Sequence, residues 1–178
     1  PGEAAALPIA LQTMHDALVT RAQLTAGQAL LIHGASTGVG LMAAKIARCL
    51  NARWIGGSST SAEKRDRLRQ LGFDEVIDPN ANWSKVVLDA TGGTGADVVV
   101  DMLGGDTFNA TLAATAIEGR IVNVGRLAGR MGNFDFDLHA LKRVQYIGVT
   151  FRTRTQEEVR KITASMLHDL AEPLNAGQ

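Results

Sequence analysis

The sequence predicts an α/β fold in which a doubly wound, parallel six-stranded sheet carries helices on both faces. Three observations support this prediction: apolar segments alternate with segments of helical spacing, the connections between them are short, and one apolar segment is a continuous β-branched run. Strands that alternate with helices across short connections pair in parallel, because each helix provides the crossover. A continuous β-branched run is typical of a strand buried on both faces. A single domain of 178 residues is large enough to bury such a core.

The predicted strands are short apolar runs bounded by turn residues. In chain order they are ALLIH (29–33), RWIGG (53–57), EVID (75–78), DVVVD (97–101), GRIVNVG (119–125) and VQYIGVTF (144–151). Pro79 ends the third, since proline cannot donate to a sheet. The fourth contains the β-branched run, which is expected of a strand buried on both faces.

The predicted helices have apolar residues at helical spacing, and two of them, 61–72 and 82–93, end at glycine. They cover 7–23, 39–50, 61–72, 82–93, 106–116 and 155–174. Gly72 is a C-terminal stop signal for the third of them. Because strands and helices follow one another in this order, the whole chain, residues 1–178, is predicted to be one Rossmann domain.

Composition excludes several classes of protein. An apolar content of 46% and a charged content of 20% are those of an ordinary globular domain, and the net charge is zero. No global field recruits nucleic acid or an anionic membrane, so we expect neither partner. No apolar stretch approaches the roughly 20 residues that cross a bilayer, and we expect a cytoplasmic protein. Cys49 is the only cysteine, which rules out an internal disulfide and a cysteine-based zinc site within the chain.

The segment LIHGASTGVG places a glycine-rich turn between the first predicted strand and the next helix. Outward-pointing amides and the helix dipole make such a turn a pyrophosphate site. We expect Gly38 to let the ligand approach and Gly40 to let the helix pack on the strand, while Ser36 and Thr37 add hydroxyl donors. Ala35 and Thr37 stand where the G-x-G-x-x-G pattern has its first two glycines. The segment predicts a dinucleotide site, with a purely structural turn as the alternative.

The end of the second predicted strand distinguishes NADP from NAD. A carboxylate at this place would bind the ribose hydroxyls of NAD. Here the letters GGSS (56–59) end the strand, and Lys64 and Arg65 follow. Small hydroxyls and cations favour a 2′-phosphate, and therefore NADP. The alternative is that both cations lie on an exposed helix face beside Glu63 and Asp66.

The turn GASTGVG also fits short-chain dehydrogenases, which use a tyrosine as general acid/base with a lysine four residues later. The only tyrosine is Tyr146, and Thr150 stands four residues on. Because the lysine is missing and Tyr146 lies in an apolar strand, we reject this family.

The remaining resemblance covers nearly the whole chain. The segments EAAALPIALQTMHDAL, LIHGASTGVG, LGFDEVID, TGGTGADVVVDMLGGDTF and GRIVNVG resemble the cofactor domain of medium-chain dehydrogenases/reductases, in particular the zinc-independent quinone oxidoreductase-like branch. The resemblance implies that a GroES-like catalytic domain precedes this one and that the present chain, which starts without methionine, is a fragment. It also implies NADPH-dependent reduction of quinones, enones or related carbonyl compounds.

The resemblance further implies roles for individual residues. Ser36, Thr37, Gly38 and Val39 would bind the pyrophosphate, and Ser58 with Lys64 the 2′-phosphate. The ribose and nicotinamide would be lined by Met102, Leu103, Val124, Gly125 and Arg126, with Thr13 facing the cleft. The strand Val144–Phe151 would pair two sheets into a homodimer. Pro79 departs from the family, which commonly has a tyrosine after the third strand.

No metal is expected. Zinc-dependent relatives have a cysteine ligand at the position of Ile9, an apolar residue that cannot bind zinc. The four histidines, His15, His33, His139 and His168, show no ligand spacing. No residue of the chain stands out as a catalytic acid, and such groups are expected in the other domain.

Three functional interpretations stay open. The first is the nucleotide-binding domain of an NADPH-dependent quinone or enone reductase. The second is an enoyl-thioester reductase or an alcohol dehydrogenase-like member of the same superfamily. The third is a non-enzymatic cofactor-binding or structural module. Such a module could contact a macromolecule through residues 120–161, a segment that contains nine basic and four acidic residues.

Overall fold

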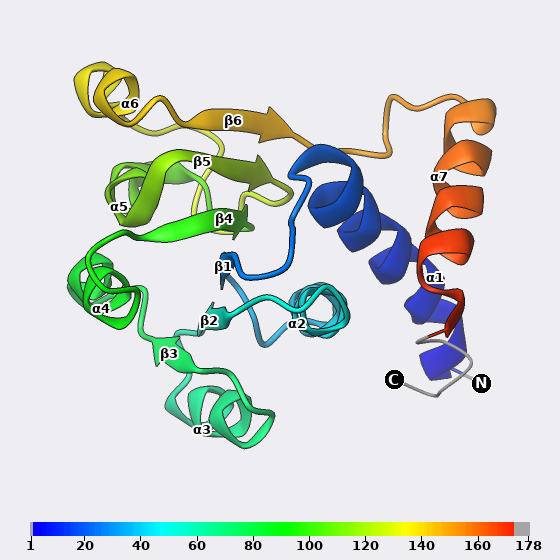
Figure 1. Cartoon of the computed structure of the whole chain (residues 1–178), viewed down its shortest axis with the longest axis horizontal. Coiled ribbons are helices and arrows are strands. Elements are labelled where there is room, and N and C mark those ends of the chain that lie inside the picture. Colours follow the sequence, from blue (N-terminus) through cyan, green and yellow to red (C-terminus); the bar gives the residue numbers. More distant parts are fainter. Residues whose placement is uncertain (1, 173–178) are drawn as a thin grey trace.

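The computed structural model describes residues 2–172 of the chain, with side chains from residue 9 onward. Its six strands form one parallel sheet in the order β3-β2-β1-β4-β5-β6 (Figure 1). The strands are β1 (Ala29–Ile32), β2 (Trp54–Ser58), β3 (Glu75–Ile77), β4 (Ala96–Asp101), β5 (Thr115–Asn123) and β6 (Gln145–Gly148). The order reverses between β1 and β4, as in the classical dinucleotide-binding sheet. The predicted fold class is therefore confirmed.

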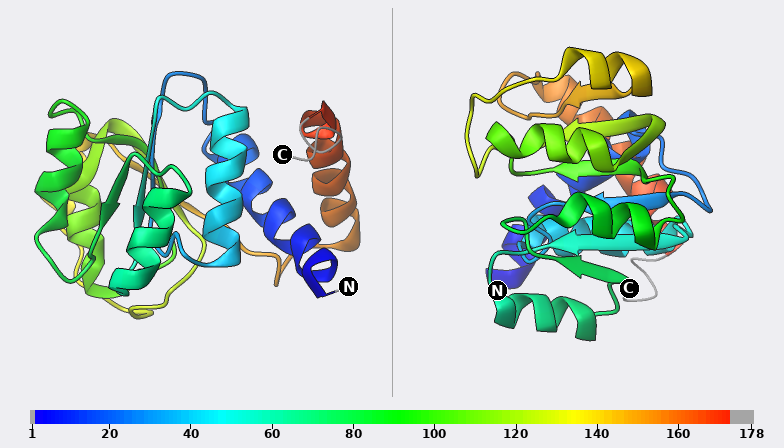
Figure 2. Two further views of the ribbon diagram at one scale, coloured as in Figure 1. Left: turned by 90° about the horizontal axis from the view of Figure 1, so that it is seen from below. Right: turned by 90° about the vertical axis from the view of Figure 1, so that its left-hand side faces the viewer.

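Helices cover both faces of this sheet. They are α1 (Gly2–His15), the π-helix η1 (Asp16–Arg21), α2 (Gly38–Cys49), α3 (Ala62–Gln70), α4 (Trp83–Ala90), the 3₁₀-helix η2 (Gly105–Thr107), α5 (Phe108–Ala114), α6 (Phe136–Lys142) and α7 (Gln156–Asp169). On one face of the sheet, α2 lies nearest to the strands, α1 lies outside α2, and α7 lies outside α1. The helices α4 and α5 cover the opposite face (Figure 2).

Alternate residues of the central strands supply two separate cores. Leu30 and Val98 point into a core shared with α1, α2, α3 and α7. Leu31 and Val99, their neighbours in sequence, point into the core beneath α4 and α5. Because successive side chains leave a strand on opposite faces, a strand buried on both sides must be apolar throughout. Val98, Val99 and Val100 of β4 are all fully buried, as predicted for a strand buried on both faces.

The start of β5 differs from the prediction. The helix expected to reach residue 116 ends at Ala114, and β5 begins at Thr115 rather than at residue 119. The pairing with β4 shifts from Ala96↔Thr115 to Val98↔Arg120, which places extra residues in β5. Within this irregularity Glu118 has a φ of 60°. The hydrogen bond from Thr115 Oγ1 to the carbonyl of Thr111 closes the helix, and such a local bond is not visible in hydrophobic periodicity.

Two helical features were not predicted. The short helix α6 begins where the side chain of Asp135 accepts a hydrogen bond from Leu138 N–H, and it has no fully buried residue. Without a buried face, the helix leaves no strong periodic signal. The predicted helix over 7–23 begins earlier, at Gly2, and its last turns become the π-helix η1.

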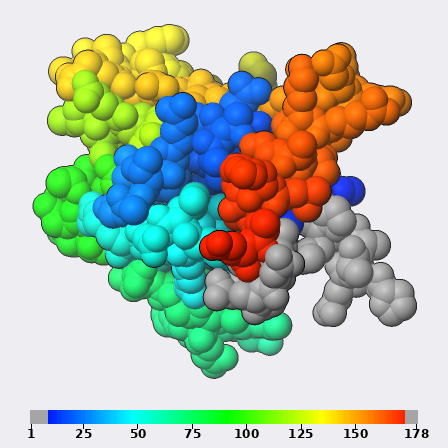
Figure 3. Space-filling model, turned by 45° about the vertical axis from the view of Figure 1, so that its right-hand side comes forward, coloured from blue at the N-terminus to red at the C-terminus, as the bar shows by residue number. Residues whose placement is uncertain are grey.

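The helix α7 lies outside α1 at the surface (Figure 3). Thr155 and Glu158 form a capping box at its start, which matches the predicted boundary at residue 155. The end predicted at residue 174 lies outside the described residues. Among residues 2–172, no helix is long and apolar enough to cross a membrane.

Candidate cofactor site

A cavity of about 370 Å³ opens at the carboxyl ends of the strands, beside the point where the strand order reverses. Ligands of open parallel sheets bind at this place. The cavity is lined by Gly34, Ser36, Thr37, Ser58, Ser59, Thr60, Lys64, Pro79, Leu103, Leu127 and Ala128. Five of these residues are predicted from the sequence as cofactor contacts: Ser36, Thr37, Ser58, Lys64 and Leu103.

The β1–α2 turn supplies one wall of the cavity. Gly34 has a φ of 67°, which a residue with a side chain rarely adopts. Thr37 is the N-cap of α2, since its Oγ1 accepts a hydrogen bond from Gly40 N–H at 3.0 Å and donates one to the carbonyl of Gly34 at 2.9 Å. The two helical amides before Gly40, those of Gly38 and Val39, have no acceptor within the helix. Together with the helix dipole they favour an anion at this end of α2.

The two glycines at the start of α2 serve different purposes. A Cβ atom on Gly40 would lie 2.7 Å from the Cα atom of Ala35 and 2.7 Å from the carbonyl oxygen of Gly34. Gly40 is therefore required for the helix to pack against the turn, as the sequence predicts. A Cβ atom on Gly38 would meet no protein atom within 4 Å. Since packing does not require glycine there, the open space at Gly38 suits the approach of a ligand.

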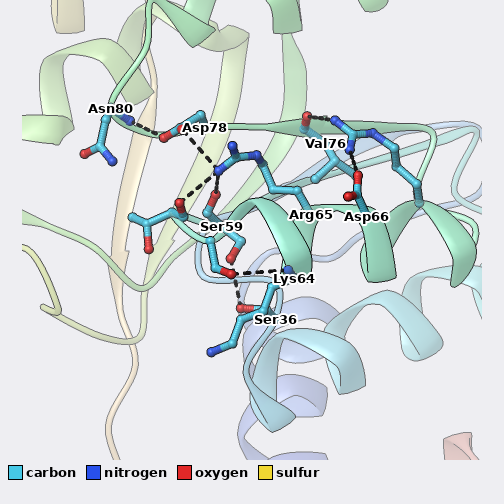
Figure 4. Close-up of polar contacts among 11 residues, drawn as sticks. Ser36, Ser59, Lys64, Arg65, Asp66, Val76, Asp78 and Asn80 are labelled. Atoms are coloured by element: carbon cyan, nitrogen blue, oxygen red, sulfur yellow. Dashed lines mark hydrogen bonds and ion pairs between the residues drawn. The ribbon is translucent and has the colours of Figure 1, made fainter.

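The end of β2 supplies the opposite wall. Ser58 is fully buried, and its Oγ accepts a hydrogen bond from Gly34 N–H at 3.1 Å. Ser58 Oγ also lies 3.2 Å from Nδ1 of His33, so this hydroxyl ties β2 to the turn. Its neighbour Ser59 lies 3.2 Å, Oγ to Oγ, from Ser36 (Figure 4). Both Ser58 and Ser59 therefore join the end of β2 to the turn.

Ser59 and Thr60 were not assigned to the site from the sequence, although the letters SSTS at the end of the second strand carry the signal. Ser58 and Ser59 are both buried, and strand alternation decides which hydroxyl of such a run bonds within the fold, so the exact end of β2 was needed to apply it.

Lys64 and Arg65, the first two cations of α3, have different surroundings. Lys64 lines the cavity, and no ion pair of the described residues involves it. Arg65, in contrast, donates through Nη1 to the carbonyls of Ser59 at 2.8 Å and Thr60 at 2.9 Å and lies 3.1 Å from Oδ2 of Asp78 (Figure 4). The alternative of two equivalent cations on an exposed face is therefore wrong for Arg65.

The remaining predicted contacts lie outside the lining of this cavity: Thr13, Gly38, Val39, Met102, Val124, Gly125 and Arg126. Thr13 Oγ1 donates to the carbonyl of Ile9 within α1. Met102 is buried beneath the turn, where Gly125 lies so close that a Cβ atom would be 2.9 Å from the Met102 carbonyl oxygen. Arg126 lines a second cavity of about 330 Å³, which lies beyond β5 and β6 and includes Asn123 and Tyr146.

Burial controls the protonation of the histidine beneath the first cavity. His33 is fully buried between Ser58 and Thr111, and desolvation lowers its pKa from 6.5 to about 4, although the Coulombic effect of Asp101 opposes this shift. The imidazole is neutral at physiological pH and holds the floor of the site together. It is not available as a ligand or as an acid.

Within the described residues, no three His, Cys, Asp or Glu side chains lie close enough together to bind a metal ion. His15 is buried and bonds through Nε2 to Asp169 at 2.9 Å. The expectation that the protein works without zinc stays a prediction.

The glycine turn, the open sheet edge and the strand order together describe a dinucleotide domain, and comparison with known proteins gives its family. Residues 38–168 match the profile of the family described as zinc-binding dehydrogenase. The chain belongs to this family. Within it, the chain is the cofactor-binding domain of a medium-chain dehydrogenase/reductase, as the sequence analysis predicted.

Individual relatives agree with this assignment. The quinone oxidoreductase of Homo sapiens is 32% identical over 165 residues, which are 92% of this chain and 49% of that protein. The nucleotide-binding subdomain of the enoylreductase domain of PpsC from Mycobacterium tuberculosis superposes with a TM-score of 0.82 at 26% identity, covering 93% of this chain and 94% of that one. A mycobacterial protein solved in complex with NADPH has a TM-score of 0.79 at 28% identity, covering 92% of this chain and 52% of that one.

The chain spans about half the length of the quinone oxidoreductases that it matches. It spans only 3% to 6% of the hybrid PKS-NRPS synthetases and polyketide synthases that also match.

Proposed function

We propose that this domain binds NADP(H) for an oxidoreductase that reduces a quinone, an enone or a related activated carbonyl compound. The observation that carries the proposal is that a single cavity joins the glycine turn to the end of β2 and to Lys64. None of the described residues that line this cavity is acidic. A site for NAD would be expected to have a carboxylate here for the ribose hydroxyls.

The residues present fit the cofactor. The amides of Gly38 and Val39 and the hydroxyls of Ser36 and Thr37 would bind the pyrophosphate. Lys64, with Ser59 and Thr60 beside it, would bind the 2′-phosphate. We retain Met102, Val124, Gly125, Arg126 and Thr13 as predicted contacts of the nicotinamide half, outside the cavity described.

Bound NADPH supplies the hydride for the reaction. The chain itself would fix the cofactor at the sheet edge, exclude water from the buried floor around His33 and leave polarisation of the acceptor to another domain. A GroES-like domain preceding this one, a zinc-free reaction, a cytoplasmic location and a homodimer through Val144–Phe151 belong to the same proposal.

An enoyl-thioester reductase is a second candidate. It is favoured by the likeness to the nucleotide-binding subdomain of an enoylreductase domain, because that subdomain and this chain cover each other almost completely. Both candidates use the same nucleotide site, and the acceptor distinguishes them. A non-enzymatic module would instead bind NADPH without reducing any acceptor in the complete protein.

Calorimetric titration of the 178-residue chain with NADPH and NADH tests the proposal. We expect NADPH to bind at least about tenfold more tightly, which corresponds to about 1.4 kcal/mol. Equal affinity for the two cofactors, or tighter binding of NADH, would contradict the assignment of Lys64 to a 2′-phosphate.

A further inference from the structure

Arg65 is the most extensively bonded cation near the proposed cofactor site. Its guanidinium contacts the carbonyls of Ser59 and Thr60 and the carboxylate of Asp78, so it links the end of β2 to the end of β3. Its side chain is only 18% exposed, and that of Asp78 is 32% exposed. A pair that is partly shielded from water is screened less by salt than one on the open surface.

Asp78 stands at a sensitive position. It lies between Ile77, whose carbonyl accepts the Ser59 N–H at 3.2 Å, and Pro79, which lines the cavity. An uncompensated carboxylate here would repel a 2′-phosphate, and it would suit the ribose hydroxyls of NAD. The end of β2 lacks a carboxylate, but the neighbouring strand brings one close to the same place.

We propose that Arg65 determines cofactor specificity by neutralising Asp78, while Lys64 contacts the 2′-phosphate directly. Arg65 thus acts on the cofactor through Asp78 and does not contact the 2′-phosphate itself. This inference rests on the proposed function, since it concerns how the same cavity selects NADP over NAD. It predicts that specificity follows the net charge of the Arg65–Asp78 pair, which is zero in the native chain.

Four variants separate charge from structure. Arg65→Gln gives the pair a charge of −1, Asp78→Asn gives +1, and the double variant returns it to zero. Arg65→Lys keeps the native charge with fewer donors. Asparagine at position 78 retains an oxygen for the hydrogen bond that Oδ1 accepts from Asn80 N–H at 3.0 Å.

The measured quantity is the ratio of the Kd for NADH to the Kd for NADPH, from calorimetry at low ionic strength. We expect the ratio to fall about fivefold in Arg65→Gln and to rise about fivefold in Asp78→Asn, as one unit of charge several ångströms away in a hydrated site would produce. The double variant and Arg65→Lys should stay within about twofold of the native ratio. Added salt should reduce all of these differences.

Several results would overturn the inference. If Arg65→Gln weakens both cofactors equally, Arg65 only holds the loop. A double variant with a ratio as low as that of Arg65→Gln would also overturn it. If circular dichroism shows that Arg65→Gln does not fold, Asp78→Asn alone tests the inference. A ratio of Kd values in Asp78→Asn equal to that of the native chain would then overturn it. Failure of the native chain to bind either cofactor would contradict the proposed function itself, whereas binding with ratios that ignore the charge contradicts only this inference.

Discussion

Nε2 of His33 lies 3.1 Å from Oγ1 of Thr111, and this contact defines the tautomer of a fully buried histidine. Thr111 donates its own hydroxyl hydrogen to the carbonyl of Thr107, so it accepts from His33 Nε2–H. Nδ1 then accepts from the hydroxyl of Ser58, which in turn accepts from Gly34 N–H. Every member of this chain is satisfied while the imidazole is neutral, and a proton on Nδ1 would break it.

The stability of the domain should therefore depend on pH through His33. The pKa of His33 is about 4 in the folded chain, against the ordinary value of 6.5 for a histidine in the unfolded chain, so between these two values the unfolded state binds the additional proton. The free energy of unfolding should fall by about 2–3 kcal/mol as the pH decreases from 7 to 4 because of this residue. Urea denaturation across this range, on the native chain and His33→Gln, measures the contribution as the difference between the two curves. His168→Gln, on exposed α7, controls for histidine removal, and curves of equal slope for His33→Gln and the native chain would contradict the prediction.

Alanine substitution should separate the roles of Gly38 and Gly40. Gly40→Ala places a methyl group 2.7 Å from backbone atoms of the turn, and we expect a loss of about 2 kcal/mol or more in the free energy of unfolding. Gly38→Ala should fold with nearly native stability, because the space around it is open, yet bind NADPH at least about tenfold more weakly, or about 1.4 kcal/mol. Thermal unfolding and calorimetry on the same samples measure both effects. Native affinity in a stable Gly38→Ala chain would show that no ligand approaches there.

The edge strand β6 should carry the proposed dimer contact. Val149 N–H bonds to Asn123 of β5, so by strand alternation the N–H of Gly148 points away from the sheet. Gly148 has room for a side chain, and proline there removes an outward donor without disturbing the pairing with β5. We expect the native chain and Gly148→Ala to sediment as dimers in analytical ultracentrifugation and Gly148→Pro as a monomer. A monomeric native chain would contradict the dimer proposal.

The isolated chain should bind cofactor but reduce acceptors very slowly. None of the described residues that line the cavity is acidic, and we place the polarising groups in another domain. NADPH oxidation in the presence of a quinone, followed by absorbance, should stay close to the rate without protein. Turnover at the rate of a complete enzyme would show that this chain contains the whole active site.

The sheet and its central strands could be predicted because burial on both faces imposes a simple pattern. The alternation of strands and helices and the run Val98–Val100 were sufficient for the fold class, and the glycine turn indicated where to look for a candidate site. The start of β5 could not be predicted, because it depends on a bond between Thr115 and Thr111 and on a local bulge against β4. The helix α6 was missed because its sequence has no face that becomes buried.

The sequence predicted which segments form the candidate site, and the structure adds which of their side chains are bonded within the fold. Ser58 was assigned to the 2′-phosphate, but its hydroxyl is used within the fold, and Ser59 faces Ser36 instead. Arg65 and Lys64 are adjacent in sequence, and only the contacts of Arg65 with the carbonyls of Ser59 and Thr60 and with Asp78 show that their surroundings differ. Such differences arise from contacts between residues far apart in the chain, which spacing alone does not reveal.

The most direct test of the cofactor site uses 2′,5′-ADP and 5′-AMP. Both lack the nicotinamide, so their affinities depend only on the part of the cofactor site that this chain lines. Calorimetric titrations would compare the native chain, Lys64→Glu and, as a control for the charge change, Lys161→Glu on α7. We expect 2′,5′-ADP to bind the native chain and the control at least about tenfold more tightly than 5′-AMP, a difference of about 1.4 kcal/mol that disappears in Lys64→Glu. Equal affinities of the native chain for the two nucleotides, or an undiminished difference in Lys64→Glu, would contradict the assignment of this cavity to the phosphorylated ribose of NADPH.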